Sequence, residues 1–218
     1  MTFVNTDDGP LLAPEADLIT AQLQRWGAHA GTELSLVLGC LEPGDTVFDV
    51  GAHIGSFAIP MGRVVGPYGS VYAFEPHADV YRYLEANIEL QALQAVVRPL
   101  PLPVGPTGEH WRHVIDEEHN TGSGRLVPND GGALETIALD DWADSQPEVT
   151  RVDLIKVDVE GLELQVLESA QTIISRHEPM LYVEVSTPPL ARYGTTAEDF
   201  RGFLINLEYR LLSDSGLR

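Results

Sequence analysis

Short, continuously apolar runs alternate along this chain with segments whose apolar residues recur every three or four positions. The continuous runs predict buried strands, and the periodic segments predict amphipathic helices. Strands are expected at residues 47–50, 70–74, 95–100, 152–161, 180–185 and 209–212, and a short strand from residue 135 precedes a helix start at residues 139–141. Helices are expected at residues 54–65, 78–90, 162–174 and 200–207. This alternation predicts an α/β fold with a doubly wound, mostly parallel, Rossmann-like sheet that carries helices on both faces.

The first 42 residues are expected to form a unit ahead of this sheet. Residues 1–14 show no periodic pattern and are interpreted as a loose lead-in. Two helices are expected next, over residues 14–27 and 32–41. We therefore divide the chain into a helical lead-in or lid, residues 1–42, and a ligand-binding domain, residues 43–218. Glu33 opens the second helix, where it either interacts with the helix dipole or contacts a cofactor.

A glycine-rich turn follows the first central strand, at Asp49-Val-Gly51-Ala52-His53-Ile-Gly55. A dinucleotide site requires Gly-x-Gly-x-x-Gly, and His53 stands where its second glycine belongs. Asp49 would repel a pyrophosphate but attract an ammonium group. S-adenosylmethionine carries an ammonium and a sulfonium and no phosphate. The turn is therefore predicted to hold its methionine moiety, with Asp49 facing the amino group directly or through water; the alternative is a structural turn with a capping Asp.

An acidic residue ends the second central strand, about 20 residues after the glycine turn. Glu75 is placed where a carboxylate accepts hydrogen bonds from both hydroxyls of a ribose, and Pro76 ends the strand sharply. The alternative is that Glu75 only caps the next helix. The proline-rich loop after the third strand, which includes Val104, is expected to border an adenine.

Residues 107–132 are rich in Gly, His and Asn and are expected to be irregular. The spacing of His110, His113 and His119 matches no standard metal cluster, so metal binding by them is disfavoured. His119 and Asn120 place polar groups on this loop, where substrate contacts commonly lie. The alternative is a mobile surface loop without a role.

Three charged residues mark the end of the fourth central strand. Strand alternation predicts Lys156, Asp158 and Glu160 on one face, and Glu184 ends the next strand. Buried charges are costly unless they are paired or functional, and ligands bind at the carboxyl ends of such strands. Asp158 and Glu160 are therefore the candidates for the reacting centre; a structural Lys156–Asp158 pair is the alternative.

Composition narrows the classes of function. The chain has 218 residues and a formal net charge of −20, which disfavours nucleic acid and anionic membranes as partners. The single cysteine, Cys40, is expected to be a buried, reduced thiol, and a cytoplasmic location is expected. We find neither a signal peptide pattern nor an apolar run long enough to span a membrane. The oligomeric state stays open.

Five motifs in this order resemble the FkbM family of S-adenosylmethionine-dependent methyltransferases. They are Pro43-Gly-Asp-Thr-Val-Phe-Asp-Val-Gly-Ala-His-Ile-Gly55, Ala73-Phe-Glu-Pro76, Thr136-Ile-Ala-Leu-Asp-Asp141, Leu154-Ile-Lys-Val-Asp-Val-Glu-Gly161 and Tyr182-Val-Glu184. The resemblance implies a seven-stranded class I methyltransferase sheet and methylation of a hydroxyl on a sugar or natural product. The family usually has Asn in place of His53, and Ala-Leu in the loop where this chain has Pro101 to Val104.

The mechanism is expected to be in-line methyl transfer with removal of the hydroxyl proton by a base. Asp158 is favoured as the base or substrate anchor, with Glu160 and His119 behind it, and Asn120 and Glu184 are expected at the substrate. An alternative is a magnesium-dependent O-methyltransferase in which Asp158 and Glu184 hold Mg²⁺. A further alternative is a module of the same fold that binds S-adenosylmethionine or another adenosine ligand without chemistry. The acceptor, whether free or carrier-bound, is a small molecule.

Overall fold

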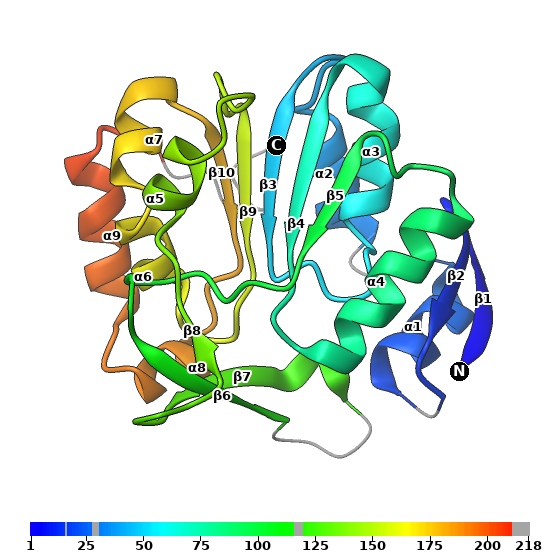
Figure 1. The fold of residues 1–218 in the computed structure, drawn as a ribbon, viewed down its shortest axis with the longest axis horizontal. Helices are drawn as coiled ribbons and strands as arrows, with labels where there is room; N and C mark the ends of the chain where they lie inside the picture. The colour runs from blue at the N-terminus through cyan, green and yellow to red at the C-terminus, as the bar shows by residue number, and fades with distance from the viewer. Residues whose placement is uncertain (16, 28–30, 116–119, 211–218) are drawn as a thin grey trace.

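The computed structural model describes residues 1–15, 17–27, 31–115 and 120–210. Its centre is a five-stranded sheet with the order β10-β9-β3-β4-β5, and every neighbouring pair is parallel (Figure 1). The strands are β3 (Thr46–Val50), β4 (Ser70–Phe74), β5 (Val97–Leu100), β9 (Leu154–Val157) and β10 (Met180–Val183). The predicted doubly wound parallel sheet is thereby confirmed. Of the seven strands that the resemblance implies, these five lie within the described residues.

Helices cover both faces of the sheet (Figure 1). One face packs against α3 (Ala58–Val65) and α4 (Ala78–Leu90), and the other against α5 (Leu139–Asp144), α6 (Glu163–Glu168), α7 (Gln171–His177) and α9 (Ala197–Asn206). Two hydrophobic cores result, because consecutive strand residues point to opposite faces. Val47 lies in the first core and Phe48 in the second. None of the described helices is both long enough and apolar enough to span a membrane.

The N-terminal segment corrects one expectation. Residues 1–14 form a hairpin of β1 (Thr2–Thr6) and β2 (Gly9–Ala13) instead of a loose lead-in. Val4 and Leu11 are buried on its inner side, and the Asn87 side chain of α4 bonds the backbone N–H and carbonyl of Leu12. The two expected helices are present as α1 (Leu18–Trp26), which begins later than residue 14, and α2 (Gly31–Leu38).

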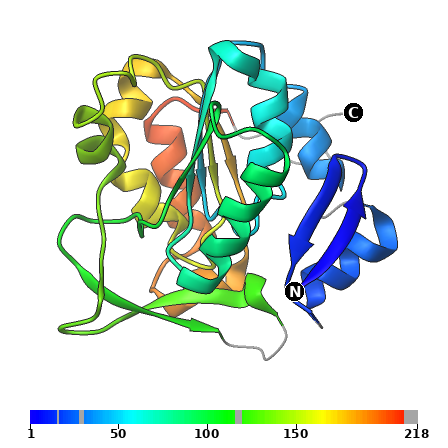
Figure 2. The same ribbon diagram turned by 45° about the vertical axis from the view of Figure 1, so that its right-hand side comes forward.

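A second sheet replaces the irregular segment expected at residues 107–132. It contains β6 (His110–Ile115), β7 (Gly124–Pro128) and β8 (Leu134–Glu135) in the antiparallel order β7-β6-β8, with the short helix η2 (Thr121–Ser123) ahead of β7. Trp111 and Leu126 pack with Leu162 in a small core of their own. Figures 1 and 2 show this sheet lying across the carboxyl ends of the central strands, where it closes that edge of the molecule.

Three further expectations change. The single helix expected at residues 162–174 is divided into α6 and α7, because the Asp140 carboxylate accepts the backbone N–H groups of Thr172 and Ile173 and so caps a new helix. Cys40 is exposed instead of buried, since it lies past the end of α2. Residues 209–210 are not in a strand, and the rest of the last expected strand lies outside the described residues.

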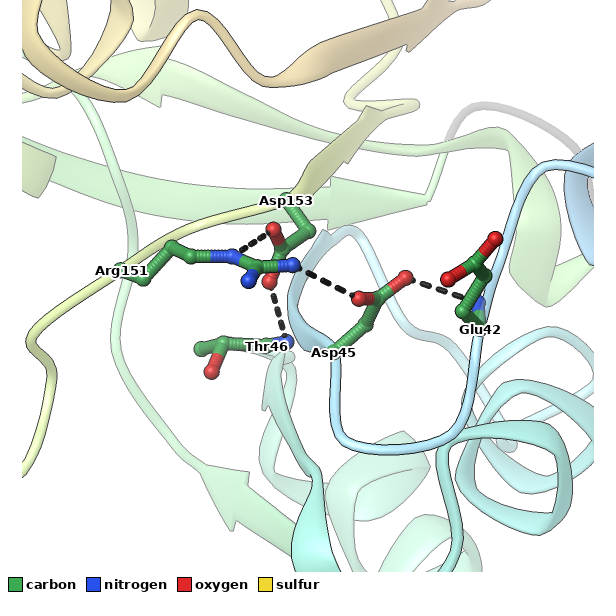
Figure 3. Close-up of polar contacts among 5 residues, drawn as sticks. All are labelled: Glu42, Asp45, Thr46, Arg151 and Asp153. Carbon is green, nitrogen blue, oxygen red and sulfur yellow. Dashed lines mark hydrogen bonds and ion pairs between the residues drawn. The ribbon is translucent and has the colours of Figure 1, made fainter.

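The amino ends of β3 and β9 are joined by a cluster of charged groups on the edge of the sheet opposite to the second sheet (Figure 3). The Arg151 guanidinium lies 3.0 Å from Asp45 Oδ1 and also contacts Asp153. These two carboxylates accept the backbone N–H groups of Glu42 and Thr46, at 2.8 and 2.9 Å. The cluster therefore holds the two central strands in register from their start. The short helices η1 (Gly66–Tyr68) and α8 (Thr187–Arg192) complete the described elements.

Candidate functional site

A cavity of about 260 Å³ lies at the carboxyl ends of the central strands, beneath the second sheet. It is enclosed by the turns after β3, β4, β9 and β10, by the first turns of α1, and by η2 and β7. Its volume is slightly below the range of roughly 300–1,000 Å³ that small-molecule sites usually have. Ten of the predicted site residues line it: Gly51, Ala52, His53, Glu75, Pro76, Val104, Asn120, Asp158, Glu160 and Glu184.

The other predicted site residues do not line this cavity. Asp49 is fully buried behind its wall. Gly55 packs the turn against the helices, since an added Cβ would lie 3.1 Å from side-chain atoms of Ile59 and Leu84. Glu33 is half-buried in the first turn of α2. His119 lies outside the described residues, so its role stays a prediction.

The glycine turn is shaped by the close approach of β9. The backbone N–H groups of Gly51 and Ala52 both donate to the Phe74 carbonyl, at 3.0 Å, instead of pointing toward a ligand. Gly51 has a φ of +82°, and an added Cβ would lie 1.8 Å from the Asp158 carbonyl oxygen. No side chain fits there, so glycine is required to bring Asp158 beside the turn. The helix expected from residue 54 begins only at Ala58.

Glu75 is held at the cavity wall by two backbone donors. Its carboxylate accepts the N–H of His53 at 3.0 Å and that of His77 at 2.8 Å. Burial raises the pKa of Glu75 to about 7, and the two backbone hydrogen bonds oppose that rise. His53 accordingly has a left-handed backbone, with a φ of +50°. The two donors fix the orientation of an acidic group that lines the cavity, at the position predicted for a ribose contact.

Lys156 forms a buried bridge between two acidic residues. Its Nζ lies 3.0 Å from Asp49 Oδ1 and 3.7 Å from Asp158 Oδ2, and it donates to the Gly51 carbonyl at 3.1 Å. Burial alone would lower the pKa of Lys156, but the charges of Asp49 and Asp158 outweigh it and raise that pKa. Burial raises the pKa of Asp49, against the effect of Lys156. Asp49 therefore supports Lys156 from behind, while Asp158 reaches the cavity.

Asp158 and Glu184 form an acidic pair on the cavity wall. The charge of Asp158 is the largest cause that raises the pKa of Glu184 to about 7, followed by burial and by Glu160. Glu184 thus exchanges a proton near neutral pH. Among the described residues, no three His, Cys, Asp or Glu side chains are grouped so that they could hold a metal ion.

Glu163 positions the turn that carries these acids, and sequence reasoning missed it. Its Oε1 accepts the backbone N–H groups of Gly161 at 2.9 Å and Val159 at 3.3 Å, and the side chain is buried. The turn is tightly bent, because Glu160 has a φ of +56° and Gly161 a φ of +119°. A Glu at the first position of a helix, two residues after a glycine, was the available signal.

The sequence predicted polar substrate contacts near η2, but it predicted no cavity residue on α1, β6 or β7. Leu18 and Ile19 of α1 and Thr121 of η2 line it, together with His113 of β6. Burial, with a smaller contribution from His77, lowers the pKa of His113 to about 4, so this imidazole is neutral at neutral pH. No local pattern marks these residues, because their positions follow from contacts between distant segments.

The parallel sheet, the glycine turn after β3 and the acid after β4 define a class I methyltransferase fold. The model of the methyltransferase FkbM domain family matches residues 49–211, and this chain belongs to that family. A solved FkbM methyltransferase from Methylobacillus flagellatus KT is similar in fold, with a TM-score of 0.53 and 18% identity over 90% of this chain and 50% of that one. A precorrin-6y C5,15-methyltransferase from Geobacter metallireducens GS-15 shares the fold with a TM-score of 0.53 and 15% identity, over 92% of this chain and 76% of that one.

Two curated relatives are similar in sequence. The hexuronic acid methyltransferase AglP of Haloferax volcanii is 30% identical over 137 residues, which are 62% of this chain and 54% of the relative. The methyltransferase sdnD of Sordaria araneosa is 29% identical over 153 residues, which are 56% of this chain and 59% of the relative. The match thus spans somewhat more than half the length of each relative.

Proposed function

We propose that this chain transfers a methyl group from S-adenosylmethionine to a hydroxyl oxygen of a small molecule. The observation that carries the proposal is the arrangement of acids in one cavity, where Glu75 and the Asp158–Glu184 pair end different strands of the same sheet. The relatives named above support a sugar acid or another natural product as the acceptor.

The residues around the cavity fit the cofactor chemically. Glu75 offers a fixed carboxylate, the acceptor that ribose hydroxyls require, and Leu102 and Val104 offer apolar side chains for a flat base. A fibrillarin from Aeropyrum pernix, solved with natively bound S-adenosyl-L-methionine, shares the fold with a TM-score of 0.50 over 84% of this chain and 66% of that one, at 15% identity. When bound, the cofactor supplies a methyl group that its sulfonium has already activated.

The chain's own residues supply alignment and a proton acceptor. A hydroxyl oxygen becomes a better nucleophile as its proton leaves, and the Asp158–Glu184 pair can receive that proton at the cavity wall. Asp158 lines the cavity 3.7 Å from Lys156, so we assign Asp158 as the proton acceptor and Glu184, whose pKa the charge of Asp158 raises, as the residue that modulates it. The second sheet and α1 cover the cavity and limit the access of water.

The test separates cofactor binding from chemistry. Glu75→Gln should weaken the affinity for S-adenosylhomocysteine by about 10- to 150-fold, because it removes hydrogen bonds to a charged group. Asp158→Asn should leave that affinity unchanged and lower the turnover of a hydroxylated sugar or polyketide by about 10²- to 10⁴-fold. Glu89→Gln, an exposed change on α4, is the matched control. Calorimetry and a methyl-transfer assay measure the two quantities; near-normal turnover by Asp158→Asn would refute the assignment.

A magnesium-dependent reaction is a second candidate, because Asp158 and Glu184 lie close enough to perturb one another. In that case a divalent ion at the two carboxylates would lower the pKa of the hydroxyl. Turnover that is lost in EDTA and restored by Mg²⁺, with unchanged affinity for S-adenosylhomocysteine, would favour it. Turnover insensitive to EDTA would leave Asp158 as the base. If S-adenosylhomocysteine binds but no acceptor is methylated, the chain is a binding module.

A further inference from the structure

A partly buried chain of hydrogen bonds links the start of α1 to the glycine turn along the cavity wall. Asp17 precedes α1 and is 2% exposed. One of its carboxylate oxygens, Oδ1, accepts the backbone N–H of Ile19 at 2.9 Å, which caps the helix. The other, Oδ2, accepts the backbone N–H of Thr121 at 2.7 Å and its hydroxyl at 2.9 Å. Thr121 Oγ1 then lies 2.8 Å from Nε2 of His53.

The direction of each hydrogen bond follows from the chemistry of the three groups. The Asp17 carboxylate oxygens accept the backbone N–H groups of Ile19 and Thr121, and Oδ2 also accepts the Thr121 hydroxyl. That hydroxyl has one proton, which is used toward Asp17. Thr121 Oγ1 must therefore accept from His53, and Nε2 of His53 carries the ring proton.

Close packing supports the same connection. An added Cβ at Gly122 would lie 2.6 Å from Cδ1 of Ile19, so η2 sits directly against α1 (Figure 1). Ile19, Thr121 and His53 all line the cavity. Asp17, Ile19 and α1 lie outside the residues that the family model matches, 49–211. Leu18 and Ile19 of this N-terminal segment line the cavity.

We propose that Asp17 and Thr121 are positioning residues that hold His53 in the Nε2–H tautomer and fix its ring orientation at the cavity wall. Nδ1 is then the unprotonated ring nitrogen, and it is buried in the turn. The effect on turnover rests on the proposed methyl transfer, in which the fixed His53 ring forms part of the wall against which the acceptor binds. The tautomer itself does not depend on that reaction.

The tautomer is measured directly on the full chain by two-bond ¹H–¹⁵N correlation spectra, with His53→Asn to assign the ring signals. Wild type and Thr121→Ser, which keeps the hydroxyl, should show only the Nε2–H form. Thr121→Val removes the hydroxyl at nearly constant shape and should show a mixture of both tautomers. Asp17→Ser retains a helix-capping side chain but is too short to reach Thr121, and it should behave like Thr121→Val.

Turnover tests the consequence. Thr121→Val and Asp17→Ser should lower kcat/KM for the acceptor by about tenfold, the effect of one hydrogen bond, and leave the affinity for S-adenosylhomocysteine unchanged. Thr121→Ser should restore kcat/KM. A wild-type Nδ1–H tautomer, or an unchanged tautomer in Thr121→Val, would overturn the proposal, as would equal kcat/KM in Thr121→Val and Thr121→Ser. If wild type methylates no acceptor, the proposed function fails while the spectra still decide the tautomer.

Discussion

Replacing Lys156 with Met should show how much the buried Lys156–Asp49 ion pair contributes to the free energy of unfolding. The substitution keeps the length of the side chain and removes its charge, so that the fully buried Asp49 loses the partner 3.0 Å away. Removal of one member of a buried pair typically costs about 3–5 kcal/mol, because the other charge is left uncompensated. For a chain of this size that loss corresponds to a fall in Tm of roughly 6–20 °C.

The free energy of unfolding that Lys156→Met loses should increase with pH. The pKa of Asp49 is already raised by burial, and removal of Lys156 raises it further. The pKa of Asp49 is then higher in the folded chain than in the unfolded chain. Such a carboxyl contributes its full stability at a pH below the pKa of the unfolded chain, and it loses that contribution as the pH rises through the pKa of the folded chain. The deficit of Lys156→Met should thus be largest at about pH 8 and smallest near pH 4.

Urea unfolding at both pH values, followed by the fluorescence of the buried Trp142, measures the deficit. The double variant Asp49→Asn/Lys156→Met removes both charges and should regain most of the loss. Arg151→Met, which removes a cation that is 65% exposed at the opposite edge, should cost less than about 1 kcal/mol. A deficit in Lys156→Met below about 1 kcal/mol at pH 8, or an equal deficit at both pH values, would refute the reasoning.

Three more outcomes are expected. Gly51→Ala should unfold the chain, or displace Asp158 and abolish turnover. Gly44→Ala is the control: Gly44 has a φ of +98° and open space around its Cβ position, so the change should cost only about 1 kcal/mol of backbone strain. Equal stability of the two variants would contradict the role given to Gly51. In wild type, loss of the Glu184 proton should raise kcat as the pH increases through about 7. Glu184→Gln should remove this rise, and an unchanged pH profile of kcat would exclude a role for the Glu184 proton. Glu163→Gln retains an acceptor for the two backbone N–H groups and should be tolerated. Glu163→Leu should lower the free energy of unfolding in urea by about 1–3 kcal/mol. Similar stability of both variants would count against the hydrogen bonds between Glu163 and the turn.

The central sheet could be predicted because each buried parallel strand leaves a local signal. Residues 47–50 and 70–74 were expected as strands and are observed within β3 and β4. The hairpin of β1 and β2 and the strands β6 and β7 of the second sheet were missed. Their strands contain Gly, Pro, His and Asn, which weaken the alternating pattern, and they are stabilised by contacts such as that of Asn87 with Leu12.

The acids of the site could be predicted because topology places the carboxyl ends of parallel strands at one edge. Glu75, Asp158 and Glu184 each follow such an end and each line the cavity. The contact between Asp17 and Thr121 could not be predicted, since 104 residues separate them and neither residue stands in a recognisable motif. The position of Glu163 beneath the turn likewise depends on a bend that no residue pattern displays.

The buried Lys156 has a practical consequence for labelling. It is the only lysine among the 218 residues, and its side chain is 2% exposed, so amine-reactive reagents reach no lysine side chain while these residues are folded. Labelling of Lys156 would therefore count the molecules that have unfolded. Mass spectrometry of the labelled chain would follow local opening of the cavity edge through one native side chain.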